Sequence, residues 1–406
     1  MKTPFTVIVP TRDRSDTLMY CIDTILAQDY DNFNVIISDN ASVDETAELI
    51  NSLSDPRIKY INTGERLSMS HNWEFALNHV EHGWVTVLGD DDGLIPGSFE
   101  KVHNIITETQ AQVIRSNGCN YIWPSITSNS YGALNISLRN GYSVLDSSKS
   151  LNETLRGKRQ YNTLPMLYNG GFVNAELIKR AKDTTGDLIK SMTPDVYLAI
   201  VIALLTEQYV CSYEPFAING ASHHSGGTAA FETKKVKRRY DPSDKFFSEK
   251  NISFHSDLPL TDAGRPVKSL HAIVLEAYLQ AAAFHKPEVV NPSYEEHLAT
   301  ILSNGGPDNS EIRAWATKFS HLHGLNLQSV EDHSRSSRQK HRLLLNDAKT
   351  ALGSLRTFLI KGTPLVPINN VYEASTLSGY IRESNPGITS LVGNVAERIS
   401  RKLRQR

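Results

Sequence analysis

The stretch Trp84-Val85-Thr86-Val87-Leu88-Gly89-Asp90-Asp91-Asp92 decides how this chain is interpreted. Its first half is apolar and β-branched, which predicts a buried strand. Its second half sets three carboxylates side by side, where they repel one another unless something positive lies close by. A divalent cation, which prefers oxygen ligands, meets that need. A solvated acidic turn is the alternative, but open α/β sheets bind their ligands at the carboxyl ends of strands.

The composition bounds the class of protein. With 406 residues, two domains are expected, and a hydrophobic content of 40% is enough for real cores. A formal net charge of -2 gives no general attraction to nucleic acid. Cys21, Cys119 and Cys211 are widely spaced and odd in number, which argues against a disulfide framework or a zinc site. We find no signal-peptide shape and no membrane-spanning run, so we expect a cytoplasmic protein.

Strands and helices alternate along the first part of the chain. Strands are predicted at 5–9, 35–37, 57–61, 84–88 and 112–115, and helices at 15–26, 43–53, 70–80 and 97–109. This alternation predicts an α/β fold with a mostly parallel sheet and helices on both faces.

Polar residues follow the first, second and fourth of these strands. They are residues 11–14, Asp39 with Asn40, and residues 90–92. Each group alone is ordinary turn chemistry. Because parallel strands end at one edge of a sheet, the three polar groups are expected to meet there. Together they indicate a nucleotide pocket. The chain contains neither G-x-G-x-x-G nor a G-K-S/T loop, so neither the dinucleotide fingerprint nor the P-loop is present.

Three later segments are candidates for the same site. Asp195 follows Pro194 at the start of an apolar helix through Leu205, where helix capping is the ordinary explanation. His223 and His224 lie among small residues that leave room for phosphate or metal, or that form a flexible loop. The basic run at 234–239 is either a solvated surface or a mobile lid over a diphosphate.

The segment 118–141 is polar and aromatic, and we expect it to cross over the site. Its Tyr121, Trp123 and Tyr131 would then present aromatic rings to a ligand, unless they form an aromatic core.

Helical patterns dominate after residue 240. They lie at 267–285, 294–303, 310–323 and 339–360, and we divide the chain into domains 1–235 and 236–406. From Pro386 onward, apolar residues form one helical stripe surrounded by basic ones. Such a tail binds an anionic membrane surface or packs on its own domain or a partner. The helices are also candidates for homo-oligomer contacts or for holding another enzyme.

Four stretches together resemble the family 2 glycosyltransferases. They are FTVIVPTRDR at 5–14, VIISDNASVDET at 35–46, HNWEFAL at 71–77, and LGDDD at 88–92 with Pro96-Gly97, which is similar to that family's DXD motif. The resemblance covers about the first 110 residues, is looser to about residue 225, and does not extend to the helical part.

The resemblance implies a GT-A fold, a nucleoside-diphosphate sugar donor (UDP first) and Mn²⁺ or Mg²⁺. By position it assigns nucleotide-sugar binding to Pro10, Thr11, Arg14, Asp39, Asn72, Asp90 and Asp91. It assigns the metal to Asp92 and His224, with His223 as the alternative, and the catalytic base to Asp195.

The implied chemistry is one inverting displacement. A metal stabilises charge on the departing diphosphate, and a carboxylate takes the proton of the attacking acceptor hydroxyl. The acceptor expected from the family and the basic tail is a bacterial envelope glycan or a lipid-linked glycan. Two alternatives stay open. One is a sugar nucleotidyltransferase, although the Gly-rich, basic loop expected after its first strand is missing from this sequence. The other is a non-catalytic scaffold.

Overall fold

The computed structural model describes residues 2–126, 131–225, 246–286, 293–304, 310–332, 334 and 357–384. The basic run at 234–239 and the tail from Pro386 therefore lie outside the described residues. Among the helices described, none is both long and apolar enough to cross a membrane.

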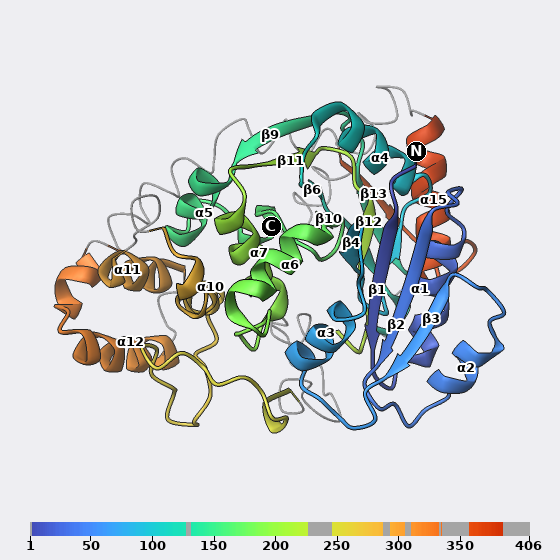
Figure 1. The fold of residues 1–406 in the computed structure, drawn as a ribbon. Coiled ribbons are helices and arrows are strands. Elements are labelled where there is room, and N and C mark those ends of the chain that lie inside the picture. Colours follow the sequence, from blue (N-terminus) through green and yellow to red (C-terminus); the bar gives the residue numbers. More distant parts are fainter. Residues whose placement is uncertain are drawn as a thin grey trace.

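The larger of two sheets carries the predicted strands. It contains β1 (Phe5–Thr11), β2 (Phe33–Asp39), β3 (Ile58–Asn62), β4 (Trp84–Val87), β6 (Val113–Ser116), β9 (Tyr142–Asp146), β10 (Gly171–Asn174) and β11 (Gln208–Ser212). The spatial order is β3-β2-β1-β4-β10-β6-β11-β9 (Figure 1). The strands β3, β2, β1 and β4 are mutually parallel. Because β10 is antiparallel to both β4 and β6, β6 runs in the same direction as β4.

Helices cover both faces of this sheet, as predicted. They are α1 (Ser15–Leu26), α2 (Thr46–Ser52), α3 (Met69–Leu77), α4 (Ser98–Thr109), α5 (Ser147–Leu155), α6 (Ala175–Thr185) and α7 (Pro194–Leu205). Alternate residues of each strand point to opposite faces, so Phe5 and Val7 pack with α1 and α4, whereas Ile8 and Val85 pack with α3, α6 and α7. Helix α7 is apolar on all sides and is almost wholly buried. The predicted α/β class is confirmed.

A second sheet was not predicted. It contains β5 (Gly93–Leu94), β7 (Cys119–Ile122), β8 (Ala133–Ser137), β12 (Ala217–Ala221) and β13 (Thr357–Lys361), in the order β13-β8-β7-β12-β5. The expected helix at 339–360 is therefore wrong at its end, because residues 357–361 pair with β8. The rest of that stretch lies outside the described residues. A β-rich segment adopts a strand when a neighbouring edge is free to pair with it.

The second sheet also corrects the interpretation of its aromatic residues. Tyr121 is 0% exposed and Trp123 is 5% exposed, so neither is a platform for sugar rings. The Tyr121 hydroxyl donates to the Ile368 carbonyl at 2.6 Å, and Trp123 Nε1 donates to the Asp91 carbonyl at 3.0 Å. Tyr131 is 41% exposed and lies outside this core.

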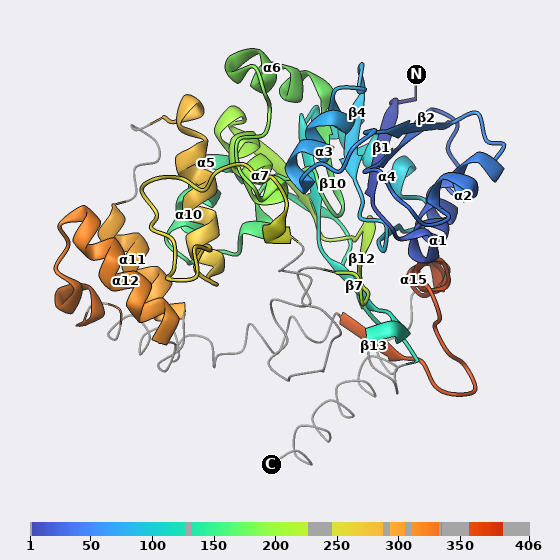
Figure 2. The same ribbon diagram turned by 90° about the horizontal axis from the view of Figure 1, so that it is seen from below.

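The mainly helical character of the C-terminal region is confirmed. It contains α10 (Leu270–Gln280), α11 (Tyr294–Asn304) and α12 (Ser310–His323), which lie together on one side of the molecule (Figure 1). The last described helix, α15 (Val371–Ser384), instead lies beside α1 (Figure 2) and also packs against β5. Ser375 Oγ donates to the Leu94 carbonyl at 2.6 Å, directly after the acidic triplet. Strand β13 and helix α15 therefore return to the unit that carries the predicted pocket.

Candidate functional site

The polar ends of the parallel strands meet at one edge of the sheet, as predicted. Thr11, at the end of β1, is the register partner of Asp39, at the end of β2. Thr11 Oγ1 donates to Asp90 Oδ2 at 2.9 Å, and Arg14 Nη1 donates to Asp90 Oδ1 at 2.8 Å. The contacts join residues about 80 positions apart in the sequence, so the edge is assembled by the sheet and not by a local turn.

Asp39 is a buried carboxylate held in one orientation. Its Oδ1 accepts from the Ser42 backbone N–H at 2.9 Å. Its Oδ2 accepts from the Tyr60 hydroxyl at 2.6 Å and from Asn62 Nδ2 at 2.9 Å. Donors on both oxygens hold the carboxylate in place at the end of β2, where it can accept a hydrogen bond from a base or a ribose.

Two predicted residues lie behind this edge. Asn72, on α3, is buried and its Oδ1 accepts from Ser38 Oγ at 2.7 Å. Pro10 lies within β1 opposite Ser38. Both residues shape the ends of β1 and β2, and their contact with a nucleotide stays a prediction.

The three adjacent carboxylates are all buried, but each has different partners. Asp91 Oδ2 accepts from the Ser222 and Ser225 hydroxyls, each at 2.6 Å. Asp92 Oδ1 accepts from the Gly220 N–H at 2.7 Å, and its Oδ2 accepts from the Gly89 N–H at 2.9 Å. Asp91 therefore contacts the loop that carries the two histidines, whereas Asp92 is held by backbone donors.

Burial and mutual repulsion change the ionisation of the triplet. Burial, and next the Asp91 charge, raise the pKa of Asp92 to about 7. Burial also raises the pKa of Asp90, and the Arg14 guanidinium opposes that shift. Burial and the charges of Asp92 and Asp91 raise the pKa of the Tyr168 hydroxyl, which hydrogen-bonds Asp92. A positive group is therefore favoured beside the triplet.

Sequence reasoning did not identify Tyr168. No pattern marks it, because it reaches Asp92 through a parallel bridge between its own backbone and Val87. That bridge is a tertiary contact between segments about 80 residues apart.

The histidine loop brings a further carboxylate into the site. His224 Nε2 lies 3.1 Å from Asp16 Oδ1, and the His224 carbonyl accepts from Arg14 Nη2 at 2.9 Å. Ligand atoms of Asp16, His223 and His224 lie within 4.8 Å of one another. Asp16 was missed, although its place in the first turn of α1, just after the loop at 11–14, could have indicated it.

The cluster of Asp16, His223 and His224 can be tested against the expected divalent metal. Carboxylate oxygen together with imidazole nitrogen is a donor set that suits Mn²⁺, and the three side chains of this cluster are partly or fully exposed. Asp91 approaches the same loop through Ser222 and Ser225. Asp92 is 0% exposed and already holds two backbone N–H groups. The residues present fit a divalent cation, with Asp16 as an added ligand candidate, and the assignment of Asp92 stays a prediction.

Asp195 lies in the first turn of α7. The Tyr161 hydroxyl donates to Asp195 Oδ2 at 3.2 Å. Burial raises the pKa of Asp195, and hydrogen bonds from the Val196 backbone and Tyr161 oppose it. The Asp195 charge also contributes to the raised pKa of Tyr168, so it lies within electrostatic reach of the residue that contacts Asp92. A carboxylate in this setting can accept a proton, and that role stays a prediction.

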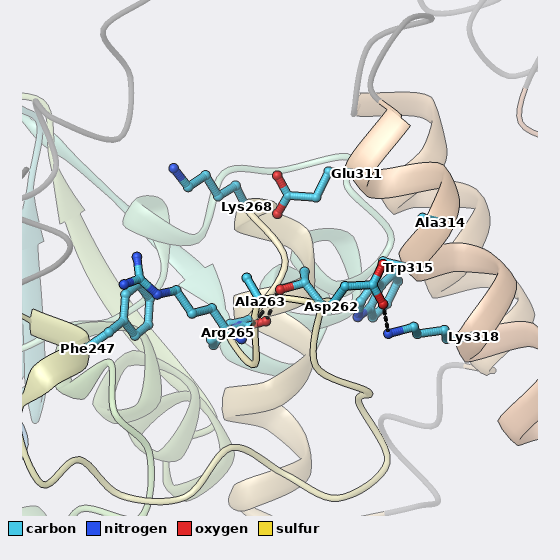
Figure 3. Close-up of a pocket in the computed structure, with 11 residues that line it drawn as sticks. Phe247, Asp262, Ala263, Arg265, Lys268, Glu311, Ala314, Trp315 and Lys318 are labelled. Carbon is cyan, nitrogen blue, oxygen red and sulfur yellow. Dashed lines mark hydrogen bonds and ion pairs between the residues drawn. The ribbon is translucent and has the colours of Figure 1, made fainter.

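A hollow of about 410 Å³ lies elsewhere, in the C-terminal helical part (Figure 3). Phe247 and Arg265 line one side of it, with the guanidinium 5.4 Å from the ring centre. Trp315 and Lys318 of α12 line the other side, and Lys318 pairs with Asp262. None of the predicted site residues lines this hollow.

Comparison with known proteins identifies related chains. Residues 6–166 match the model of Glycosyl transferase family 2. Glycosyltransferase GlyA of Streptococcus pneumoniae is 31% identical over 114 residues, which are 28% of this chain and 16% of that protein. The GalNAc(5)-diNAcBac-PP-undecaprenol beta-1,3-glucosyltransferase of Campylobacter jejuni is 34% identical over 110 residues, 26% of this chain and 36% of that protein. The match thus spans well under half of these relatives.

A solved structure is also similar. The crystal structure of S. aureus TarS 1-349 in complex with UDP-GlcNAc aligns with a TM-score of 0.44 and 15% identity, over 79% of this chain and 92% of that chain.

Proposed function

Because residues 6–166 match the model of Glycosyl transferase family 2, we propose that this chain transfers a sugar from a nucleoside-diphosphate sugar to an acceptor hydroxyl. The observation that carries the proposal is the edge at which Thr11, Arg14, Asp39 and Asp90 converge. The acceptor is a glycan or a lipid-linked glycan, and the pathway is bacterial envelope polysaccharide synthesis. Related proteins include a glucosyltransferase named for an undecaprenol-linked substrate and a succinoglycan biosynthesis protein, which supports this choice.

The donor nucleotide, with UDP as the first candidate, would lie over β1 and β2. Asp39 is free of any cationic partner in the described part of the chain and would accept from the base or ribose. Asp90 would lie near the ribose, while Arg14 holds its carboxylate and the carbonyl of His224 together. These fixed contacts would position the diphosphate beside the histidine loop.

A bound Mn²⁺ or Mg²⁺ would neutralise the charge that develops on the diphosphate leaving group. His224 is the proposed ligand from the histidine loop, with His223 as the alternative. Asp92 is the ligand that the resemblance assigns within the triplet. Asp91 is the alternative, because it contacts the histidine loop through Ser222 and Ser225. Asp16 would complete the set.

Asp195 would be the catalytic base. Its carboxylate takes the proton of the acceptor hydroxyl as that oxygen bonds to the anomeric carbon and the bond to the diphosphate breaks. One displacement of this kind inverts the anomeric configuration and needs no covalent intermediate. The raised pKa of Asp195 supports the role, since a base needs some affinity for the proton.

The first test is thermal unfolding of the full chain with a panel of nucleoside diphosphates, with and without Mn²⁺. Ligand at a hundredfold its dissociation constant adds about 2.7 kcal/mol of stability. We expect a shift with one nucleotide, UDP first, that is larger with Mn²⁺. If no nucleotide shifts the unfolding temperature, either with or without Mn²⁺, the proposal is refuted.

Matched variants then identify the metal ligands. Asp91→Asn, Asp92→Asn, Asp16→Asn and His224→Ala are compared for the Mn²⁺-dependent part of the shift. A variant that lacks a metal ligand should lose the Mn²⁺-dependent part of the thermal shift. The control is Asp187→Asn, which changes an exposed acid paired with Lys190 and should leave that part intact. Loss in Asp91→Asn with retention in Asp92→Asn would move the triplet ligand to Asp91.

A further inference from the structure

Arg115 is a buried arginine without an acidic partner. Its exposed fraction is 7%, and Nη1 donates to the neighbouring Ser116 carbonyl. Across the described residues, no carboxylate forms an ion pair with it. Burial lowers the pKa of Arg115, as expected for a charge removed from water without compensation. Such an arrangement costs stability, and an anion bound to the guanidinium would offset that cost.

Arg115 lies on the same edge of the sheet as the donor pocket. It is next to last in β6, which runs in the same direction as β1 and β4. Its register partners are Gly171 on β10 and Cys211 on β11. The predicted nucleotide residues occupy the edge at β2, β1 and β4, so Arg115 lies beyond them, on the far side of β10. Ligands of open α/β sheets bind along this edge.

Two further arginines make the surroundings of Arg115 positive. The Arg139 guanidinium stacks 4.1 Å from the ring centre of Tyr213, and its buried Nε has no hydrogen-bond partner in the described chain. Arg159 pairs with Glu153 at 2.9 Å. Burial raises the pKa of the Cys211 thiol, and the charges of Arg115, Arg159 and Arg139 oppose that shift. The charges of three arginines therefore act on the Cys211 thiol, and one of the three, Arg159, is paired with a carboxylate.

Tyr161 connects Arg115 with the proposed base. Tyr161 donates to Asp195 Oδ2 at 3.2 Å. The Asp195 charge, and next burial, raise the pKa of Tyr161, while Arg115 opposes the shift. Tyr161 therefore lies within electrostatic reach of both Asp195 and Arg115. A group bound by Arg115 would be close to the hydroxyl whose proton Asp195 takes.

We propose that Arg115, with Arg139, binds a phosphate group of the acceptor next to the reacting hydroxyl. The planar guanidinium fork matches phosphate oxygens, and a buried fork binds them more strongly than an exposed one. The inference rests on the glycosyltransferase function proposed above and names the class of acceptor. The diphosphate of a lipid-linked sugar and the phosphodiester of a polymer share this chemistry.

The first experiment measures binding of inorganic phosphate to the full chain by isothermal titration calorimetry, with and without saturating UDP. We expect phosphate to bind in both conditions. Arg115→Gln should weaken that binding about tenfold or more, the size expected for a lost hydrogen bond between charged groups. Arg57→Gln, which removes a surface arginine paired with Asp55, should leave it unchanged. Equal affinity in the wild type and Arg115→Gln would overturn the subsite, as would phosphate binding that UDP abolishes.

A stability measurement separates this role from a structural one. Arg115→Met replaces an uncompensated buried charge with an apolar side chain of similar length. We expect an unchanged or higher Tm together with lost phosphate binding. A large drop in Tm, or failure to fold, would instead assign Arg115 to the scaffold. Arg139→Gln, at a partly exposed position, should weaken phosphate binding in the folded protein, and an unchanged affinity there would remove Arg139 from the subsite.

Transfer assays then distinguish the two sources of phosphate. The acceptors are a short-chain prenyl diphosphate sugar, a phosphodiester-linked oligosaccharide and a neutral oligosaccharide. One phosphate-bearing acceptor should have the lowest KM, and Arg115→Gln should raise that KM about tenfold or more while Arg115→Lys restores part of it. Equal use of the neutral acceptor would contradict the inference. A wild type that neither binds UDP nor consumes a donor refutes the proposed function, whereas the phosphate titration tests the subsite by itself.

Discussion

At Asp195, a hydrogen bond from a tyrosine side chain helps to set the pKa of the proposed base. The Tyr161 hydroxyl donates to the ionised carboxylate, which favours the charged form and lowers the pKa against the effect of burial. A base acts when deprotonated, so activity falls as pH drops through its pKa. Since burial raises that pKa, the acidic limb of the activity profile should lie above the range of an ordinary aspartate.

Tyr161→Phe tests this relation. Loss of the donated hydrogen bond raises the pKa of Asp195 further, so we expect the acidic limb of kcat/KM to move to higher pH. Asp195→Asn should lower kcat by about 10²–10⁴-fold, the usual contribution of a general base. Tyr197→Phe is the control, because the Tyr197 hydroxyl is buried without a partner in the described structure. An acidic limb that does not move in Tyr161→Phe would contradict the assignment.

At the scale of elements, strand β12 holds the acidic triplet in place. The Gly220 N–H donates to Asp92, and a Cβ on Gly220 would lie 1.8 Å from the Asp91 carbonyl oxygen. Strand and triplet can approach this closely because residue 220 has no side chain. The orientation of the three carboxylates thus depends on a strand more than 120 residues away.

Gly220→Ala should therefore disturb both stability and binding. We expect the free energy of unfolding to fall by about 1–3 kcal/mol, as for overpacking of a filled interior, and the nucleotide-induced thermal shift to shrink. Denaturant titration and thermal unfolding measure the two effects. Gly118→Ala is the matched control, since its Cβ would meet one atom, Asn120 Nδ2, at 3.9 Å. Equal behaviour of the two variants would show that the approach of β12 is unimportant.

At the scale of the whole molecule, the last described segments, β13 and α15, pack on the unit formed by the first part of the chain. Strand β13 pairs with β8, and α15 covers the core formed by Ile95, Tyr121 and Ile218. Gly379 of α15 packs against Pro96, four residues after the triplet. A stable catalytic unit should therefore need residues far beyond the predicted boundary at 235.

A chain ending at residue 235 tests this dependence. We expect it to expose the second-sheet core and to aggregate or unfold without cooperativity. Joining residues 357–384 to it through a Gly/Ser linker should restore a cooperative transition and the nucleotide-induced shift. The same linker without 357–384 is the control. A soluble 1–235 chain with the Tm and nucleotide binding of the full chain would support the original boundary instead.

The sequence by itself determined the α/β class and the edge at which the site is built. Apolar periodicity is local, and strands joined by crossover helices run parallel, so Thr11, Asp39 and Asp90 follow strands that end on one edge. Most predicted helices and strands agree with the structure within a few residues for the same reason.

Tertiary structure alone decided what lies around that edge. The return of β13 and α15, the burial of Trp123, and the contacts of Asp16, Tyr168 and Arg115 each depend on segments distant in the sequence. Local patterns show whether a residue is polar, apolar or turn-forming, but they carry no information on the register between distant strands. That register determines which of the three carboxylates faces the histidine loop and which is held by the backbone of β12.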